Sequence, residues 1–168
     1  MDVLEFGCGT GSTALIHAPR VKSYLATDTS PQMIDIARER VAKQPTDNLQ
    51  LAVATLEDLS GRQLEFNAVL GLNVLHLLRD PENTIRQVYS LLKPGGVFIS
   101  NTACLRDTCS VLKPVAYAAR MLRLAPYVNF LSHRDLDAFM ERAGFRIEHH
   151  WTPETSKSVY FLIATKPS

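Results

Sequence analysis

The sequence predicts an α/β protein with a mostly parallel β-sheet and helices on both faces. Through the first two thirds of the 168 residues, short apolar segments of strand length alternate with helical segments, which is typical of parallel strands joined by crossover helices. Two further apolar segments, 145–152 and 158–165, are separated by only five residues, a loop short enough for an antiparallel hairpin.

Five strands are expected in the alternating part of the chain. Because strands of a parallel sheet are covered on both faces, they form nearly continuous apolar runs bounded by polar or turn residues. Segments of this kind cover residues 2–6, 23–28, 49–54, 66–72 and 97–102.

The segments between these strands carry signals for helix starts and stops. A helix is expected at about 10–17, and a second one begins after the N-cap Ser30, with Pro31 in the first helical position. A third helix is expected over 80–92, where the sequence KPGG ends it.

The last third of the chain does not continue this alternation of strands and helices. The connection over 104–131 has its own helical stretch at about 110–124, and we expect a lid-like insertion between the fifth strand and the last helix. Ser132 and Asp135 have the spacing of a capping box for that helix, which is expected to end at Gly144. We expect residues 1–168 to form a single domain.

Composition and charge exclude several classes of protein. Hydrophobic residues make up 46% of the chain and charged residues 21%, which argues against disordered, collagen-like and coiled-coil proteins. The 18 basic and 17 acidic residues give a net charge of +1, so no nucleic-acid partner is expected. No membrane span, signal peptide or disulfide framework is indicated, which favours a cytoplasmic location. A homodimer is possible but is not indicated by the sequence.

The segment EFGCGTGS, residues 5–12, lies between the first strand and the first helix. A glycine-rich turn lets the backbone approach a ligand, and the helix N-terminus adds partial positive charge, so the segment predicts a cofactor site. Its spacing is G-x-G-x-G, whereas dinucleotide sites have G-x-G-x-x-G, and Ser12 occupies the last glycine position of that pattern. A dinucleotide-dependent oxidoreductase is therefore the weaker interpretation.

The segment LEFGCGTGS resembles motif I of the class I S-adenosylmethionine-dependent methyltransferases. Three further segments resemble that family in the same order: SPQMIDIARER, VYSLLKPGGVFI and FMERAGFRI. The resemblance is to methyltransferases of the small-molecule type, with a type 11 or type 25 methyltransferase-like domain. It implies a Rossmann-like, seven-stranded sheet of order 3-2-1-4-5-7-6 with an antiparallel last strand. It also implies S-adenosyl-L-methionine as the cofactor and S-adenosyl-L-homocysteine as its product.

The resemblance further implies where the cofactor binds. Asp28 occupies the place of the acid that holds the ribose hydroxyls, and Met33 is a candidate to pack on the adenine. Thr55 stands where the family frequently has an aspartate, which leaves Glu57 and Asp58 as substitutes. The full set of expected cofactor-binding residues is Glu5, Gly7, Cys8, Gly9, Gly11, Asp28, Thr29, Met33, Thr55, Leu56, Glu57, Leu72 and Asn73.

These assignments have purely structural alternatives. The glycines could form a tight turn only, Asp28 could cap the following helix, and Met33 could be a core residue. Cys8 is interpreted as a small packing residue, because no histidine stands beside it in the sequence.

His76 and Asn73 are the candidate catalytic residues. Both follow the fourth strand, at the sheet edge where open α/β sheets bind their ligands. His76 is interpreted either as a base near the transferred methyl group or as a helix-surface histidine, and Asn73 has the same two interpretations. No metal site is expected, because the cysteines lack zinc-ligand spacing and His149 and His150 have no third ligand in view.

The expected function is methyl transfer from S-adenosylmethionine to a small, partly apolar acceptor at oxygen, nitrogen or carbon. The sequence has no motif of the nucleic-acid methyltransferases. The alternative is a non-catalytic methyltransferase-like protein that binds the cofactor, or a subunit that depends on a partner. This alternative arises because the first expected strand starts at the beginning of the sequence, where the family usually has upstream helices that help to cover the cofactor. Either residues 104–131, alone or with a second subunit, cap the cofactor site, or the chain is a truncated or degenerate member.

Overall fold

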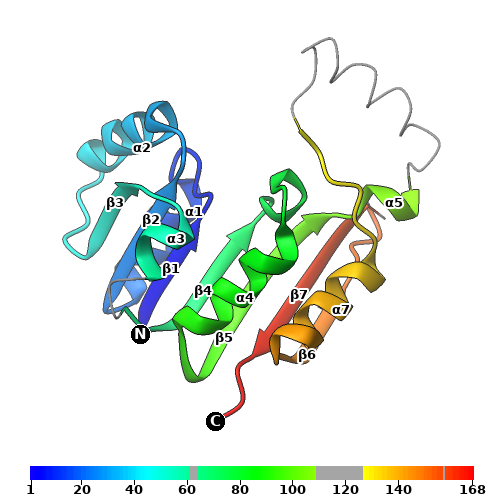
Figure 1. The fold of residues 1–168 in the computed structure, drawn as a ribbon. Coiled ribbons are helices and arrows are strands. Elements are labelled where there is room, and N and C mark those ends of the chain that lie inside the picture. The colour runs from blue at the N-terminus through cyan, green and yellow to red at the C-terminus, as the bar shows by residue number, and fades with distance from the viewer. Residues whose placement is uncertain (61–63, 109–126, 157) are drawn as a thin grey trace.

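The computed structural model describes residues 1–60, 64–108, 127–156 and 158–168 and contains a seven-stranded sheet (Figure 1). The strand order β3-β2-β1-β4-β5-β7-β6 confirms the predicted topology. Neighbouring strands from β3 to β5 are parallel, whereas β7 is antiparallel to both β5 and β6. The strands are β1 (Asp2–Phe6), β2 (Ser23–Asp28), β3 (Leu49–Val53), β4 (Phe66–Leu72), β5 (Leu92–Ala103), β6 (Arg146–Trp151) and β7 (Val159–Thr165).

Helices cover both faces of the sheet, because successive side chains of a strand point to opposite sides. Leu4 and Phe6 of β1 share one apolar core with α3, α4 and α7, which lie in front of the sheet in Figure 1. Val3 belongs to a second core that includes residues of α1 and α2. The helices are α1 (Ser12–His17), η1 (Ala18–Arg20), α2 (Pro31–Lys43), α3 (Leu56–Ser60), η2 (Leu75–Leu77), α4 (Pro81–Leu91), α5 (Leu105–Thr108) and α7 (His133–Ala143).

The side chains at the helix ends confirm the predicted caps. The hydroxyl oxygen of Ser30 accepts a hydrogen bond from the backbone N–H of Met33 at 3.4 Å, at the start of α2. Ser132 and Asp135 form the reciprocal capping box of α7. Gly144 ends that helix in the left-handed conformation, with φ of 97°.

The boundary between α4 and β5 differs from the prediction. The strand already begins at Leu92, which pairs with Phe66, and the next pair is Val97 with Ala68. The segment KPGG therefore lies in an irregularity of the ladder between β4 and β5, instead of separating helix and strand. The helical stretch predicted at about 110–124 lies outside the described residues.

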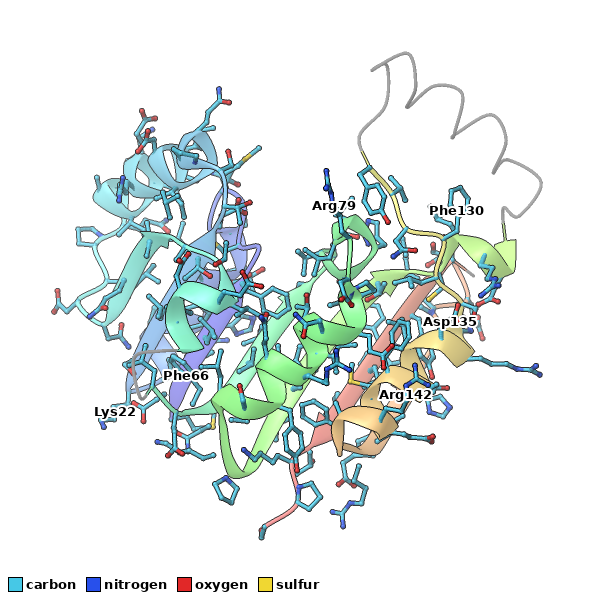
Figure 2. The ribbon with its side chains drawn as sticks, in the orientation of Figure 1. Lys22, Phe66, Arg79, Phe130, Asp135 and Arg142 are labelled. Carbon is cyan, nitrogen blue, oxygen red and sulfur yellow. The ribbon has the colours of Figure 1, made fainter. Side chains whose placement is uncertain are left out.

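The helix α7 is held against both α4 and β7. Arg142 donates a hydrogen bond from Nε to Oε1 of Glu82 on α4 at 2.8 Å, and Figure 2 labels Arg142 on the side of α7 that faces α4. The Tyr160 hydroxyl of β7 donates to Oδ1 of Asp137 at 2.8 Å. Within the described residues, no helix has the length and apolar character needed to cross a membrane.

Candidate functional site

A cavity of about 580 Å³ lies beyond the carboxyl ends of the strands, where the turns after β1, β2, β3 and β4 meet. This volume is in the usual range of a small-molecule site. Its lining residues are Phe6, Gly7, Gly9, Asp28, Thr29, Ser30, Met33, Ala54, Thr55, Leu56, Glu57, Asn73, Val74, Leu77, Leu78, Thr84 and Gln87.

The glycine turn after β1 forms one wall of the cavity. Gly7 and Gly9 have φ of 66° and 53°, a backbone conformation that other residues rarely adopt. A Cβ on Gly7 would lie 2.6 Å from Cγ2 of Val74, so this position has no room for a side chain. At Gly9 no atom lies within 4 Å of the corresponding point, which leaves open space against the backbone. The turn can therefore admit a ligand at Gly9.

Asp28 connects the end of β2 to the glycine turn. Its Oδ2 accepts the backbone N–H of Gly9 at 2.8 Å, and its Oδ1 accepts that of Ser30 at 2.9 Å. An ionised carboxylate has about four acceptor positions, so both oxygens keep capacity for further donors. Ser30 provides the N-cap of α2, and Asp28 lies at the cavity.

Two acidic residues near the start of α3, Glu57 and Asp58, have different contacts. Both the backbone N–H and the hydroxyl of Thr55 donate to Oδ2 of Asp58, each at 2.8 Å, so Asp58 closes the turn. Glu57 lines the cavity, and Oε1 of Glu57 accepts a hydrogen bond from Nε2 of Gln87 at 3.3 Å. Met33 also lines the cavity with 39% of its surface exposed, and it is not part of the core.

Asn73 adopts a strained backbone conformation at the cavity. Among the described residues it is the non-glycine residue with positive φ, at 56°. Its N–H donates to both the backbone oxygen and the Oδ1 of Asn101, at 2.9 and 2.5 Å. Asparagine tolerates this conformation better than most residues, and such strain concentrates at functional sites.

His76 does not line the cavity, although its neighbours in the chain, Val74, Leu77 and Leu78, do. It is buried, with 8% of its surface exposed, which disagrees with the interpretation as a helix-surface histidine. Its Nδ1 is buried and has no hydrogen-bond partner among the described residues. Burial lowers the pKa of the imidazole, so the ring is neutral near pH 7. The backbone oxygen of His76 accepts the N–H of Asn129 at 2.6 Å.

Four of the predicted cofactor residues lie outside the cavity lining: Glu5, Cys8, Gly11 and Leu72. Glu5 instead accepts a hydrogen bond from the Tyr24 hydroxyl at 2.7 Å, and burial raises the pKa of its carboxyl to about 7. Cys8 packs in the second core, as predicted.

The remaining residues that line the cavity do not belong to any motif that can be recognised in the sequence. The apolar ones, such as Val74 and Leu78, resemble core residues in the sequence, and Thr84 and Gln87 resemble helix-surface residues. Only the fold brings these residues to the glycine turn.

Comparison with known proteins gives the family of the chain. Residues 1–150 match a family described as a methyltransferase domain. A curated relative from Xanthomonas axonopodis pv. citri (strain 306), the ubiquinone biosynthesis O-methyltransferase, is 30% identical over 151 residues. That alignment covers 87% of this chain and 63% of the relative, so the chain spans less than two thirds of the relative's length.

Solved structures share the fold at lower sequence identity. The magnesium protoporphyrin IX methyltransferase of Synechocystis PCC 6803 with bound SAH has a TM-score of 0.77 at 19% identity, covering 99% of this chain and 74% of that chain. An S-adenosylmethionine dependent methyltransferase from Mesorhizobium loti has a TM-score of 0.79 at 19% identity, covering 98% and 90% of the two chains.

Proposed function

The chain belongs to this family of S-adenosylmethionine-dependent methyltransferase domains, and from that premise we propose that it transfers a methyl group to a hydroxyl of a small, partly apolar acceptor. Bound in the cavity, S-adenosylmethionine would supply a methyl group that is already activated on a sulfonium. The chain's own residues then have to bind the cofactor, orient the acceptor and accept its proton.

The observation that carries the proposal is the position of Asp28. Two backbone N–H groups hold its carboxylate at the cavity, and each oxygen keeps an acceptor position for a ribose hydroxyl. Hydrogen bonds to a charged group are among the stronger ones in proteins. The open space at Gly9 admits the cofactor against the backbone on the same side.

The rest of the cavity supports an adenine site. Met33 and Leu56 offer apolar surface for the ring, and the Glu57 carboxylate offers an acceptor for its exocyclic amine. Asp58 is less suitable for that contact, because it closes the turn at Thr55.

The choice of a hydroxyl acceptor rests on the O-methyltransferase relatives and on His76. A hydroxyl must lose its proton during transfer, which calls for a base near the acceptor. His76 is neutral near pH 7, and its Nδ1 has no hydrogen-bond partner among the described residues. Its neighbours in the chain, Val74, Leu77 and Leu78, line the cavity. We therefore assign the base to His76, whose ring would turn toward the cavity when the acceptor binds. We assign Asn73 the role of positioning the acceptor at that wall.

The test is a turnover assay with the purified chain. S-adenosylmethionine is incubated with a panel of small phenols and alcohols, and formation of S-adenosylhomocysteine and methylated product is followed by mass spectrometry. The proposal expects product from at least one aromatic alcohol and none from the Asp28→Ala variant at the same cofactor concentration. Cofactor binding without turnover on any acceptor would contradict the proposal and favour a non-catalytic or partner-dependent protein.

A further inference from the structure

Three metal-ligating side chains gather at the carboxyl end of β5, outside the cofactor cavity. Cys104 directly follows β5, Asp107 lies in α5 and His133 opens α7. One ligand atom from each residue lies within 4.8 Å of the other two. We propose that Cys104, Asp107 and His133 bind a divalent cation of the zinc class.

The spacing of the cluster is close to that of a metal site. The Nδ1 of His133 lies 3.7 Å from Oδ2 of Asp107. Zinc bonds to sulfur, nitrogen and oxygen are about 2.0–2.3 Å long, so two ligands of one tetrahedral ion lie about 3.3–3.8 Å apart. One pair already has this separation, and rotamer adjustments of about 1 Å would bring the third ligand into place.

The ring of His133 is held in a fixed position at the cluster. It stacks on Tyr160, with centroids 4.3 Å apart and an interplanar angle of 21°. An imidazole binds a given ion through one nitrogen, and Nδ1, which lies beside Asp107, is that ligand. The stacking therefore limits the movement needed for His133 to coordinate an ion.

The acidic surroundings of Cys104 favour a cation. The Cys104 side chain is fully buried, and the carboxylates of Asp107, Asp135 and Asp137 lie near it. A metal ion bound there would replace the proton of the thiol and stabilise the thiolate. Arg106 forms an ion pair with Asp135 at 2.9 Å, at the start of α7 where Figure 2 labels Asp135.

A solvent-facing groove gives an ion access to the cluster. It is lined by Arg106, Asp107, Ser132, His133, Arg134 and Asp135. Thiolate and imidazole ligands select zinc over magnesium or calcium, which prefer oxygen ligands. A bound ion would join Cys104, after β5, and Asp107, in α5, to His133 at the start of α7, residues that are 29 and 26 positions apart in the sequence. That separation explains why the spacing of the cysteines and histidines did not indicate a site.

The test measures metal binding by the full chain without any cofactor. Zinc is titrated against a chromophoric chelator, and cobalt(II) is used as a spectroscopic probe, because its bond to a thiolate absorbs in the near ultraviolet. The expected result is one equivalent of zinc per chain and a cobalt–thiolate band. Since neither readout involves methyl transfer, the outcome is independent of the proposed function.

Variants identify the ligands. Cys104→Ala and His133→Ala should each weaken zinc binding at least tenfold, and Cys104→Ala should abolish the cobalt–thiolate band. The matched controls Cys8→Ala and His17→Ala should leave both readouts unchanged, with circular dichroism confirming the fold of every variant. If Cys104→Ala does not fold, His133→Ala provides the test of the metal site. The His133 side chain is 31% exposed, so its removal should disturb the fold less. Absence of the band, a band that survives Cys104→Ala, or zinc affinity unchanged by His133→Ala would overturn the proposal.

Discussion

Two acidic residues flank the glycine turn, and the structure gives them different environments. Asp28 lies at the cavity and accepts two backbone N–H groups, whereas Glu5 is buried against Tyr24. Of the two, only Asp28 lines the cavity, although both were expected to bind the cofactor. The difference lies in the burial and the hydrogen-bond partners of each carboxylate, which the residue types alone do not reveal.

Asp28→Ala should weaken binding of S-adenosylhomocysteine by at least about 100-fold, because it removes two hydrogen bonds to a charged group, each of which contributes about 1.5–3 kcal/mol. Calorimetric titration measures the affinity, and circular dichroism checks the fold. Asp35→Ala is the matched control, since Asp35 is an exposed residue of α2 that pairs with Arg38. An affinity unchanged by Asp28→Ala would remove Asp28 from the ribose role.

His76→Ala should slow methyl transfer about 100-fold and leave cofactor affinity unchanged, because general bases typically contribute 10²- to 10⁴-fold. The wild-type rate should also persist at pH 6.5 and fall only in more acidic solution, since burial lowers the pKa of His76 below that ordinary value. Steady-state rates with a hydroxyl acceptor, measured across pH, provide the check. A fully active variant would assign His76 a structural role.

At the scale of elements, a buried pair links β1 to β2 and makes stability depend on pH. Oε2 of Glu5 accepts the Tyr24 hydroxyl at 2.7 Å, and burial raises the pKa of the Glu5 carboxyl from 4.5 to about 7. Because the folded state prefers the protonated form, the contribution of Glu5 is greatest below pH 4.5. It is lost as the pH rises through 7.

The free energy of unfolding of the wild type, relative to Glu5→Gln, should therefore decrease by about 3 kcal/mol between pH 4.5 and pH 8, at 1.36 kcal/mol per pKa unit. Urea denaturation at both pH values measures it. Taking the difference between the two proteins removes the contributions of the other titrating groups. A difference that stays constant with pH would show that Glu5 is ionised at an ordinary pKa.

The capping box of α7 gives a second prediction for an element. Ser132→Ala removes the hydroxyl that accepts the Asp135 N–H, and it should lower the free energy of unfolding by about 1 kcal/mol. Ser90→Ala is a suitable control, because Ser90 is exposed within α4 and should change stability by less than about 0.5 kcal/mol. Equal effects of the two substitutions in urea denaturation would argue against the capping role.

At the scale of the whole molecule, local signals predicted most of the architecture. Alternating apolar segments gave the strands, and Ser30, Ser132 and Gly144 marked helix ends that the structure confirms. The order of the strands came from the resemblance carried by the glycine turn and the later motifs, since hydrophobic patterns do not specify which strands are neighbours.

The parts that were not predicted depend on contacts between distant segments. The irregularity at KPGG arises from pairing with β4. The cluster of Cys104, Asp107 and His133 arises because the start of α7 lies beside the residues that follow β5. The apolar side of the cavity, including Val74 and Leu77, likewise has no local signature. Periodicity and motif spacing act over a few residues, so they do not report such contacts.

The central claim is that the cavity beside Gly9 and Asp28 binds S-adenosylmethionine, and calorimetric titration of the purified chain tests it most directly. S-adenosylmethionine, S-adenosylhomocysteine and NAD are titrated under the same conditions. We predict that the first two bind at one site with micromolar affinity and that NAD does not bind. Failure of both sulfur compounds to bind, or binding of NAD in preference to them, would contradict the account.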